Sequence, residues 1–125
     1  MRPPRRVALD CVVGVAGSIA AGSPVTVPEA GVQLIEAIWD KDLDRAQKIQ
    51  VVMLEHGERI APMRAYGRRI TLEGLRLRGL AVKEYPRWPT KPLSAEHMKL
   101  YEETMKRFLD ELAALTPAPK KKIAV

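Results

Sequence analysis

The sequence predicts a mainly α-helical fold in which one strand-like segment precedes four helices. Residues 7–21 are almost continuously apolar with many small side chains, as in a strand covered on both faces. The rest of the chain repeats apolar residues at helical steps of three and four positions, between helix-start and helix-stop residues. A chain of 125 residues with 46% apolar and 29% charged residues suits one globular domain.

The strand-like segment over 7–21 needs partners for its backbone N–H and C=O groups. No other run in the sequence is a convincing strand. Gly14 and Gly17 weaken an isolated strand, but they suit a place where another backbone or a ligand comes close. We therefore expect the missing partners to lie outside this chain. The Gly-Ser-Pro sequence at 22–24 predicts a turn after the segment.

The first two helices are predicted over 27–39 and 43–61. Thr26 is placed to cap the first, with Glu29 at the capping-box position, and Asp42 is placed to cap the second. The apolar face of the first helix is Val27, Ala30, Leu34, Ala37 and Ile38, and that of the second is Ala46, Ile49, Met53, Gly57 and Ile60.

Two further helices are predicted over 69–78 and 95–115. Pro62 ends or kinks the preceding helix, Gly79 provides a left-handed stop after the third, and Ser94 caps the last. The last helix has the clearest apolar face, formed by Tyr101, Met105, Phe108, Leu112 and Leu115.

The predicted domain spans residues 7–115. Between the third and fourth predicted helices, residues 82–93 form an irregular linker that contains several prolines. The basic, proline-containing ends at 1–6 and 116–125 are predicted to be disordered.

The net charge of +6 is spread over the two ends and one internal stretch. Residues 64–91 hold eight basic groups against Glu73 and Glu84, but the chain has few aromatic residues and no nucleic-acid-binding motif. A solvated basic face is therefore expected, with nucleic acid an unlikely partner. RNA binding through 64–91 stays open as a third, weaker alternative.

The single cysteine, Cys11, excludes an intrachain disulfide and suits a reducing compartment, so a cytoplasmic location is expected. The basic start followed by an apolar stretch imitates a signal peptide, but Asp10 interrupts it. The stretch is also too short to span a bilayer as a helix, and no membrane partner is expected.

Motifs that carry chemistry are absent from the sequence. It contains no phosphate loop, no Cys or His pair at metal-ligand spacing and no nucleophile elbow. His56 and His97 fall on different helices and are expected at the surface. An amine nucleophile requires a desolvated or cation-flanked lysine, and every lysine lies in a polar turn, linker or helix face. No catalytic residue, metal site or cofactor is therefore assigned.

Three motifs in sequence order resemble the dihydrodipicolinate synthase / N-acetylneuraminate lyase family. Residues 14–20 (Gly-Val-Ala-Gly-Ser-Ile-Ala) are similar to the end of that family's eighth strand. Val-Pro-Glu at 27–29 and Asp-Leu-Asp-Arg-Ala at 42–46 follow at the family's spacing. Residues 87–94 (Arg-Trp-Pro-Thr-Lys-Pro-Leu-Ser) resemble its joint before the last helix. The resemblance covers residues 8–113.

The resemblance implies the C-terminal part of a (β/α)8 barrel, namely strand eight and helix eight, plus the family's three-helix extension. The family consists of Schiff-base aldolases, which act on pyruvate through a catalytic lysine. That lysine, a tyrosine and a threonine pair precede this region in the family, so the chain is expected to be catalytically incomplete alone. The positions that would border the barrel mouth and contact substrate are Gly17, Ser18, Ile19 and Ala20.

The alternative is a non-enzymatic helical module for oligomerisation or interaction. Without a barrel, the apolar faces at Leu34/Ile38 and Tyr101/Phe108 are expected to be exposed, with self-association as the remedy. The expected partner is accordingly either further copies of the chain or a missing N-terminal barrel portion.

Overall fold

The computed structural model of the protein describes residue 14, residues 23–83 and residues 90–116. Within these residues the chain forms five α-helices and one 3-10 helix, and no strand, so the prediction of a mainly α-helical fold is confirmed. The elements are α2 (Ser23–Thr26), α3 (Pro28–Trp39), α4 (Leu43–Arg59), the 3-10 helix η1 (Ala61–Tyr66), α5 (Arg68–Leu77) and α6 (Ala95–Ala114).

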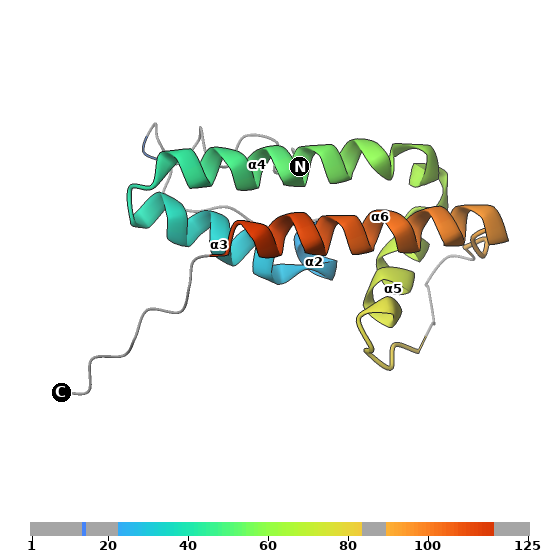
Figure 1. Ribbon diagram of the computed structural model, residues 1–125. Coiled ribbons are helices and arrows are strands. Elements are labelled where there is room, and N and C mark those ends of the chain that lie inside the picture. Colours follow the sequence, from blue (N-terminus) through green and yellow to red (C-terminus); the bar gives the residue numbers. More distant parts are fainter. Residues whose placement is uncertain (1–13, 15–22, 84–89, 117–125) are drawn as a thin grey trace.

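Helices α3 and α4 form an antiparallel hairpin, and α6 returns along α4 in the opposite direction (Figure 1). Helix η1 and helix α5 lie at the far end of α4, where α5 also contacts α2. Helix α2 lies against the first half of α6, where the Tyr101 phenol hydrogen-bonds Thr26.

The tight turn between α3 and α4 follows from its capping bonds. The Asp42 N–H donates to the Ala37 carbonyl (2.9 Å) and the Lys41 N–H to the Ile38 carbonyl (3.0 Å), which closes α3. Lys41 adopts a left-handed φ of 59° at this stop. The Asp42 carboxylate then accepts from the Arg45 N–H (3.1 Å), which starts α4 as predicted.

The other predicted helix boundaries also have their expected causes. Helix α4 ends three residues before Pro62, and the chain continues as η1. Gly79 has a φ of 80°, and its N–H and that of Leu80 donate to carbonyls of the last turn of α5. The Ser94 hydroxyl accepts from the His97 N–H (3.2 Å) and starts α6.

The start of α3 differs from the prediction. Residues 23–26 form the short helix α2 rather than a turn, because a proline is tolerated in the first turn of a helix. Val27, which offers no side-chain cap, is the N-cap residue of α3, whereas Thr26 is buried in α2. Glu29 pairs with Arg78, the C-cap residue of α5, instead of closing a capping box.

The predicted strand over 7–21 lies outside the described residues, apart from Gly14. Gly14 has a φ of 96°, which is not the conformation of a strand. The predicted disordered ends also lie outside the described residues, apart from Thr116. The Thr116 hydroxyl donates to the Leu112 carbonyl (3.2 Å) and accepts from the Gln33 amide (2.9 Å), so this residue is fixed against α3 and α6.

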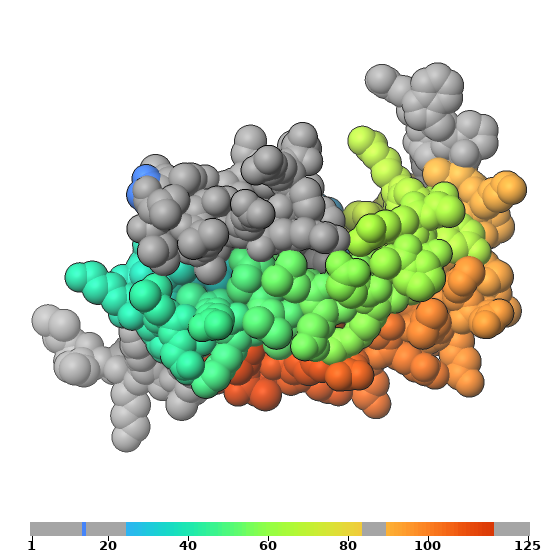
Figure 2. Space-filling view, turned by 90° about the horizontal axis from the view of Figure 1, so that it is seen from above, coloured from blue at the N-terminus to red at the C-terminus, as the bar shows by residue number. Residues whose placement is uncertain are grey.

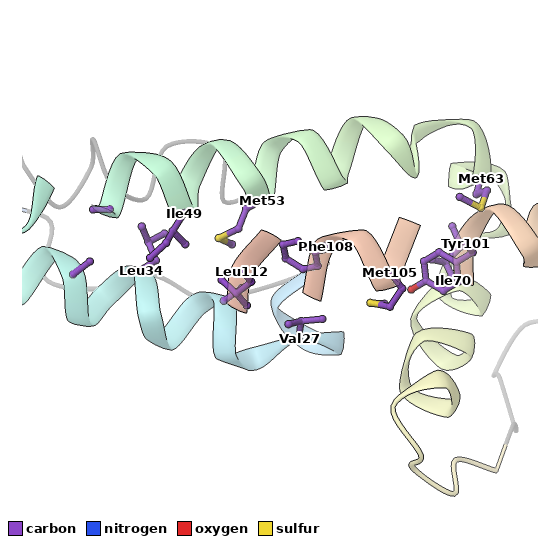
Figure 3. Packing of buried hydrophobic residues seen from close by; sticks show 13 residues of the cluster. Val27, Leu34, Ile49, Met53, Met63, Ile70, Tyr101, Met105, Phe108 and Leu112 are labelled. Atoms are coloured by element: carbon purple, nitrogen blue, oxygen red, sulfur yellow. The ribbon is translucent and has the colours of Figure 1, made fainter. Parts of the chain in front are cut away.

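One apolar core joins η1 and the helices α3 to α6 (Figure 3). The expectation that the faces at Leu34 and at Tyr101/Phe108 are exposed is wrong. Leu34 and Tyr101 are each 1% exposed and Phe108 is 0% exposed, because these faces pack against one another within the chain. The buried apolar residues are Val27, Ala30, Leu34, Ala37, Ala46, Ile49, Met53, Met63, Ile70, Tyr101, Met105, Phe108 and Leu112.

Gly74 marks the closest approach of α5 to its neighbours. A Cβ at this position would lie 2.4 Å from Tyr101 Oη, 2.7 Å from Thr26 Cγ2 and 3.3 Å from Met105 Cε. A side chain here would therefore push α5 away from α2 and α6. The poor helix propensity of glycine is tolerated because only glycine fits this contact.

We expect Gly74→Ala to destabilise the protein by about 1–3 kcal/mol, because the added methyl overpacks a contact with buried groups. Gly57→Ala is the matched control. Gly57 lies within α4, where a Cβ would meet nothing within 4 Å, so alanine should stabilise the helix by about 0.5–1 kcal/mol. Urea denaturation measures both changes, and equal effects of the two substitutions would contradict the close approach.

Candidate functional site

The predicted substrate-contacting residues Gly17, Ser18, Ile19 and Ala20 lie outside the described residues. The lysines of the described ranges are Lys41, Lys48, Lys83, Lys91, Lys99 and Lys106, and each is exposed. None of these six amines therefore has the desolvated surroundings that a Schiff-base nucleophile needs. In the described part, no three His, Cys, Asp or Glu side chains converge as they would around a metal ion.

Tyr101 is the centre of a buried polar cluster between α2, α5 and α6. Its phenol hydrogen-bonds the Thr26 hydroxyl and lies against Gly74. Burial raises the pKa of Tyr101 to about 12, and the negative charge of Glu73 acts in the same direction. The phenol is therefore neutral at physiological pH, so the cluster fixes the packing of three helices and does not supply a base.

Glu73 is a buried carboxylate that holds two arginines of its own helix. Its Oε1 accepts from Arg69 Nε (2.7 Å) and from Arg76 Nη1 (2.8 Å). Arg78 pairs with Glu29 across α5 and α3. Three basic groups of the stretch 64–91 are thus engaged by carboxylates of the same chain, which weakens the case for RNA binding through this stretch.

His56 is buried, so the expectation of a surface residue is wrong. It is 1% exposed, and its ring stacks flat on Phe108 with centroids 4.3 Å apart. Burial lowers the pKa of His56 to about 4, and the positive charge of Arg59 acts in the same direction while Glu111 opposes it. Among the described residues, His56 Nδ1 has no hydrogen-bond partner. The neutral ring serves as part of the core between α4 and α6.

His97 joins the start of α6 to η1. Its Nδ1 lies 2.9 Å from the Tyr66 hydroxyl, and the two rings meet edge to face with centroids 5.5 Å apart. The Ser94 N–H also donates to the Tyr66 hydroxyl (3.4 Å). These bonds fasten the end of the linker, and they bring together a tyrosine of η1 and a histidine of α6.

An open groove of about 560 Å³ runs between α4 and the C-terminal end of α6. Figure 2 shows these two elements side by side, with α4 in teal to green and the end of α6 in red. The lining is apolar at its centre and charged along its edges. It consists of Asp44, Gln47, Lys48, Val51, Val52, Glu55, Glu111, Ala114 and Leu115.

Ion pairs form the edges of this groove. Lys48 pairs with Asp44 (2.6 Å), and Arg59 bridges Glu55 (2.6 Å) and Glu111 (2.8 Å). The hydrogen bond from Arg59 holds the pKa of Glu111 below its usual range. Glu111 is therefore ionised at neutral pH, and Asp44, Glu55 and Glu111 each have a positive partner within the same chain.

A second exposed apolar surface follows α2 and α3. Val25, Val32 and Trp39 are 46%, 55% and 76% exposed, and the seven-residue spacing of Val32 and Trp39 places these two on one face of α3. Exposed apolar residues in such a line are a typical surface for contact with another polypeptide. We call Val25, Val32 and Trp39 the outer apolar line.

Within the described residues the fold is a small helical bundle with exposed apolar surfaces along the α4–α6 groove and the outer apolar line. No protein-family model, curated protein or solved structure matches the chain. None of the helices in the described part has the length and apolar character of a bilayer-spanning segment.

The buried His56 makes stability depend on pH. An ordinary histidine titrates near 6.5, whereas native His56 resists protonation down to about pH 4. The unfolded chain therefore binds this proton first as the pH falls. The contribution of neutral His56 to the free energy of unfolding is therefore fully present above pH 6.5. It falls by up to about 3 kcal/mol between pH 6.5 and pH 4. Denaturation midpoints across this pH range measure the loss.

The control is His56→Gln, which removes the titrating group and keeps a polar side chain of similar length. The variant should be less stable at neutral pH, with a flatter dependence between pH 6.5 and 5, because carboxylates titrate mostly below that range. Parallel curves for the two proteins would show that His56 is not protected from protonation in the native state.

Proposed function

We propose that this chain is the C-terminal helical part of a dihydrodipicolinate synthase-like Schiff-base lyase of the cytoplasm. Two features support the proposal. The resemblance motifs occur in the family's order, and the described helices of ten or more residues number four, α3 to α6, as implied by one barrel helix plus a three-helix extension. In this assignment α3 corresponds to barrel helix eight, and α4, α5 and α6 correspond to the extension.

The outer apolar line is the observation that carries the proposal. A barrel helix must pack against its own strand and neighbouring barrel elements, so α3 needs an apolar surface besides the one that contacts α4. Val32 and Trp39 provide such a surface on the side of α3 opposite its buried stripe. A barrel packed there would cover side chains that this chain alone leaves in water.

The chemistry assigns the chain a structural role in that enzyme. A Schiff-base lyase forms an imine between its lysine and the ketone of pyruvate, and this requires an unprotonated amine. The six described lysines are exposed, so the reacting amine is proposed to come from the barrel. The chain would contribute the packed end of the barrel and, through Gly17 to Ala20, part of its mouth.

Borohydride trapping tests whether the reacting lysine lies in the barrel polypeptide rather than in this chain. The isolated chain incubated with pyruvate and borohydride should give no reduced adduct by mass spectrometry. Expressed together with the polypeptide encoded in frame upstream, it should give one adduct, on a lysine of that polypeptide. An adduct on this chain alone, or an upstream sequence that does not encode the missing barrel strands, would refute the proposal.

The second candidate is a non-enzymatic helical module that binds other copies or other proteins. The α4–α6 groove favours it, because this apolar opening lies away from the outer apolar line. Sedimentation of the purified full chain separates the candidates in part. A chain that stays folded and soluble with no barrel polypeptide bound favours the module, whereas a chain that is soluble only with the upstream polypeptide favours the lyase.

A further inference from the structure

The side of α4 that borders the groove carries charges of alternating sign. Along the helix these groups are Asp44, Lys48, Glu55 and Arg59, reading negative, positive, negative, positive. Their spacing of four, seven and four residues places them on one face of the helix. Val51 lies at the middle of this face, where it is 44% exposed and lines the groove.

This charge order reverses its sign when the helix is read backwards. In an antiparallel pair of α4 helices whose twofold axis passes between positions 51 and 52, Lys48 of one copy lies opposite Glu55 of the other. Asp44 likewise lies opposite Arg59. All four charges thus meet opposite charges, while Val51 of each copy lies next to Val52 of the other.

We propose that a second copy of this chain occupies the α4–α6 groove in this antiparallel, twofold arrangement. The contact removes Val51 and Val52 from water, and Ala114 and Leu115 of α6 form the wall against which the second α4 rests. The existing pairs Lys48–Asp44 and Glu55–Arg59 are of the exposed helical kind, which contribute little by themselves. Sharing these charges with a second copy therefore costs little.

The outer apolar line cannot pair with itself in the same way. Its polar flank on α3 is acidic, with Glu29, Glu36 and Asp40 following one side of the line. A twofold contact there would bring carboxylates of the two copies together, which opposes association. Charge complementarity thus selects the groove as the surface for self-association and leaves the outer apolar line for a different partner.

The test measures the dimer dissociation constant of the full chain by sedimentation equilibrium. Lys48→Glu places like charges opposite Glu55, twice by symmetry, and should weaken the dimer by about tenfold. The double substitution Lys48→Glu/Glu55→Lys should restore it. Within each chain that double variant has like charges at both four-residue steps, so restoration can come only from pairing between chains. Lys99→Glu, on an exposed part of α6 outside the groove, is the matched control and should leave the constant unchanged.

Circular dichroism checks that each variant keeps its helices. A chain that stays monomeric at all concentrations, a dimer indifferent to Lys48→Glu, or a double variant no tighter than the single one would overturn the arrangement. A dimer that disappears when the chain is ended at Thr116 would assign the contact to the C-terminal tail and would also overturn it. The two proposals fail separately. Sedimentation measures how many copies of the chain associate, whereas borohydride trapping detects a Schiff base, so a negative result in one experiment leaves the other proposal standing.

Discussion

The contact between the apolar stripe of α6 and the α3–α4 hairpin holds the protein together. Phe108 lies at the centre of this contact, with no exposed surface and with the His56 ring stacked on it. Burying a side chain of this size stabilises a fold by about 1.5–3 kcal/mol. Helix α6 is far from the hairpin in sequence, so its packing converts local helices into one bundle and fixes where the groove lies.

The same burial limits what the polar groups can do. Among the described residues, Tyr101 and His56 are the titratable side chains most perturbed by their surroundings, and both are kept neutral inside the core. Neither has access to a substrate, because each is only 1% exposed. The reachable features of the described part are instead apolar surfaces with charged edges. Contact with another polypeptide is the role that we propose for these surfaces.

Sequence periodicity predicted the helices well, because the residues that start and stop them act locally. Asp42, Ser94 and Gly79 cap as expected, and the stripe from Tyr101 to Leu112 is buried. The burial of His56 could not be predicted, because it depends on Phe108 of a distant helix. Thr26 was misassigned for the same reason: its hydroxyl is needed by Tyr101 rather than by the next turn. The predicted residues Gly17 to Ala20 lie outside the described part, and the groove arises only when α4 meets α6.

Methionine side chains form part of the apolar core. Met53, Met63 and Met105, three of the five methionines in the chain, are buried among the apolar side chains. Thioethers are flexible enough to fill irregular space, but oxidation to the sulfoxide makes them polar and incompatible with a dry interior. Met63 has no exposed surface, so peroxide can reach its sulfur only when the elements around it separate. The rate at which Met63 is oxidised therefore measures how often the bundle opens.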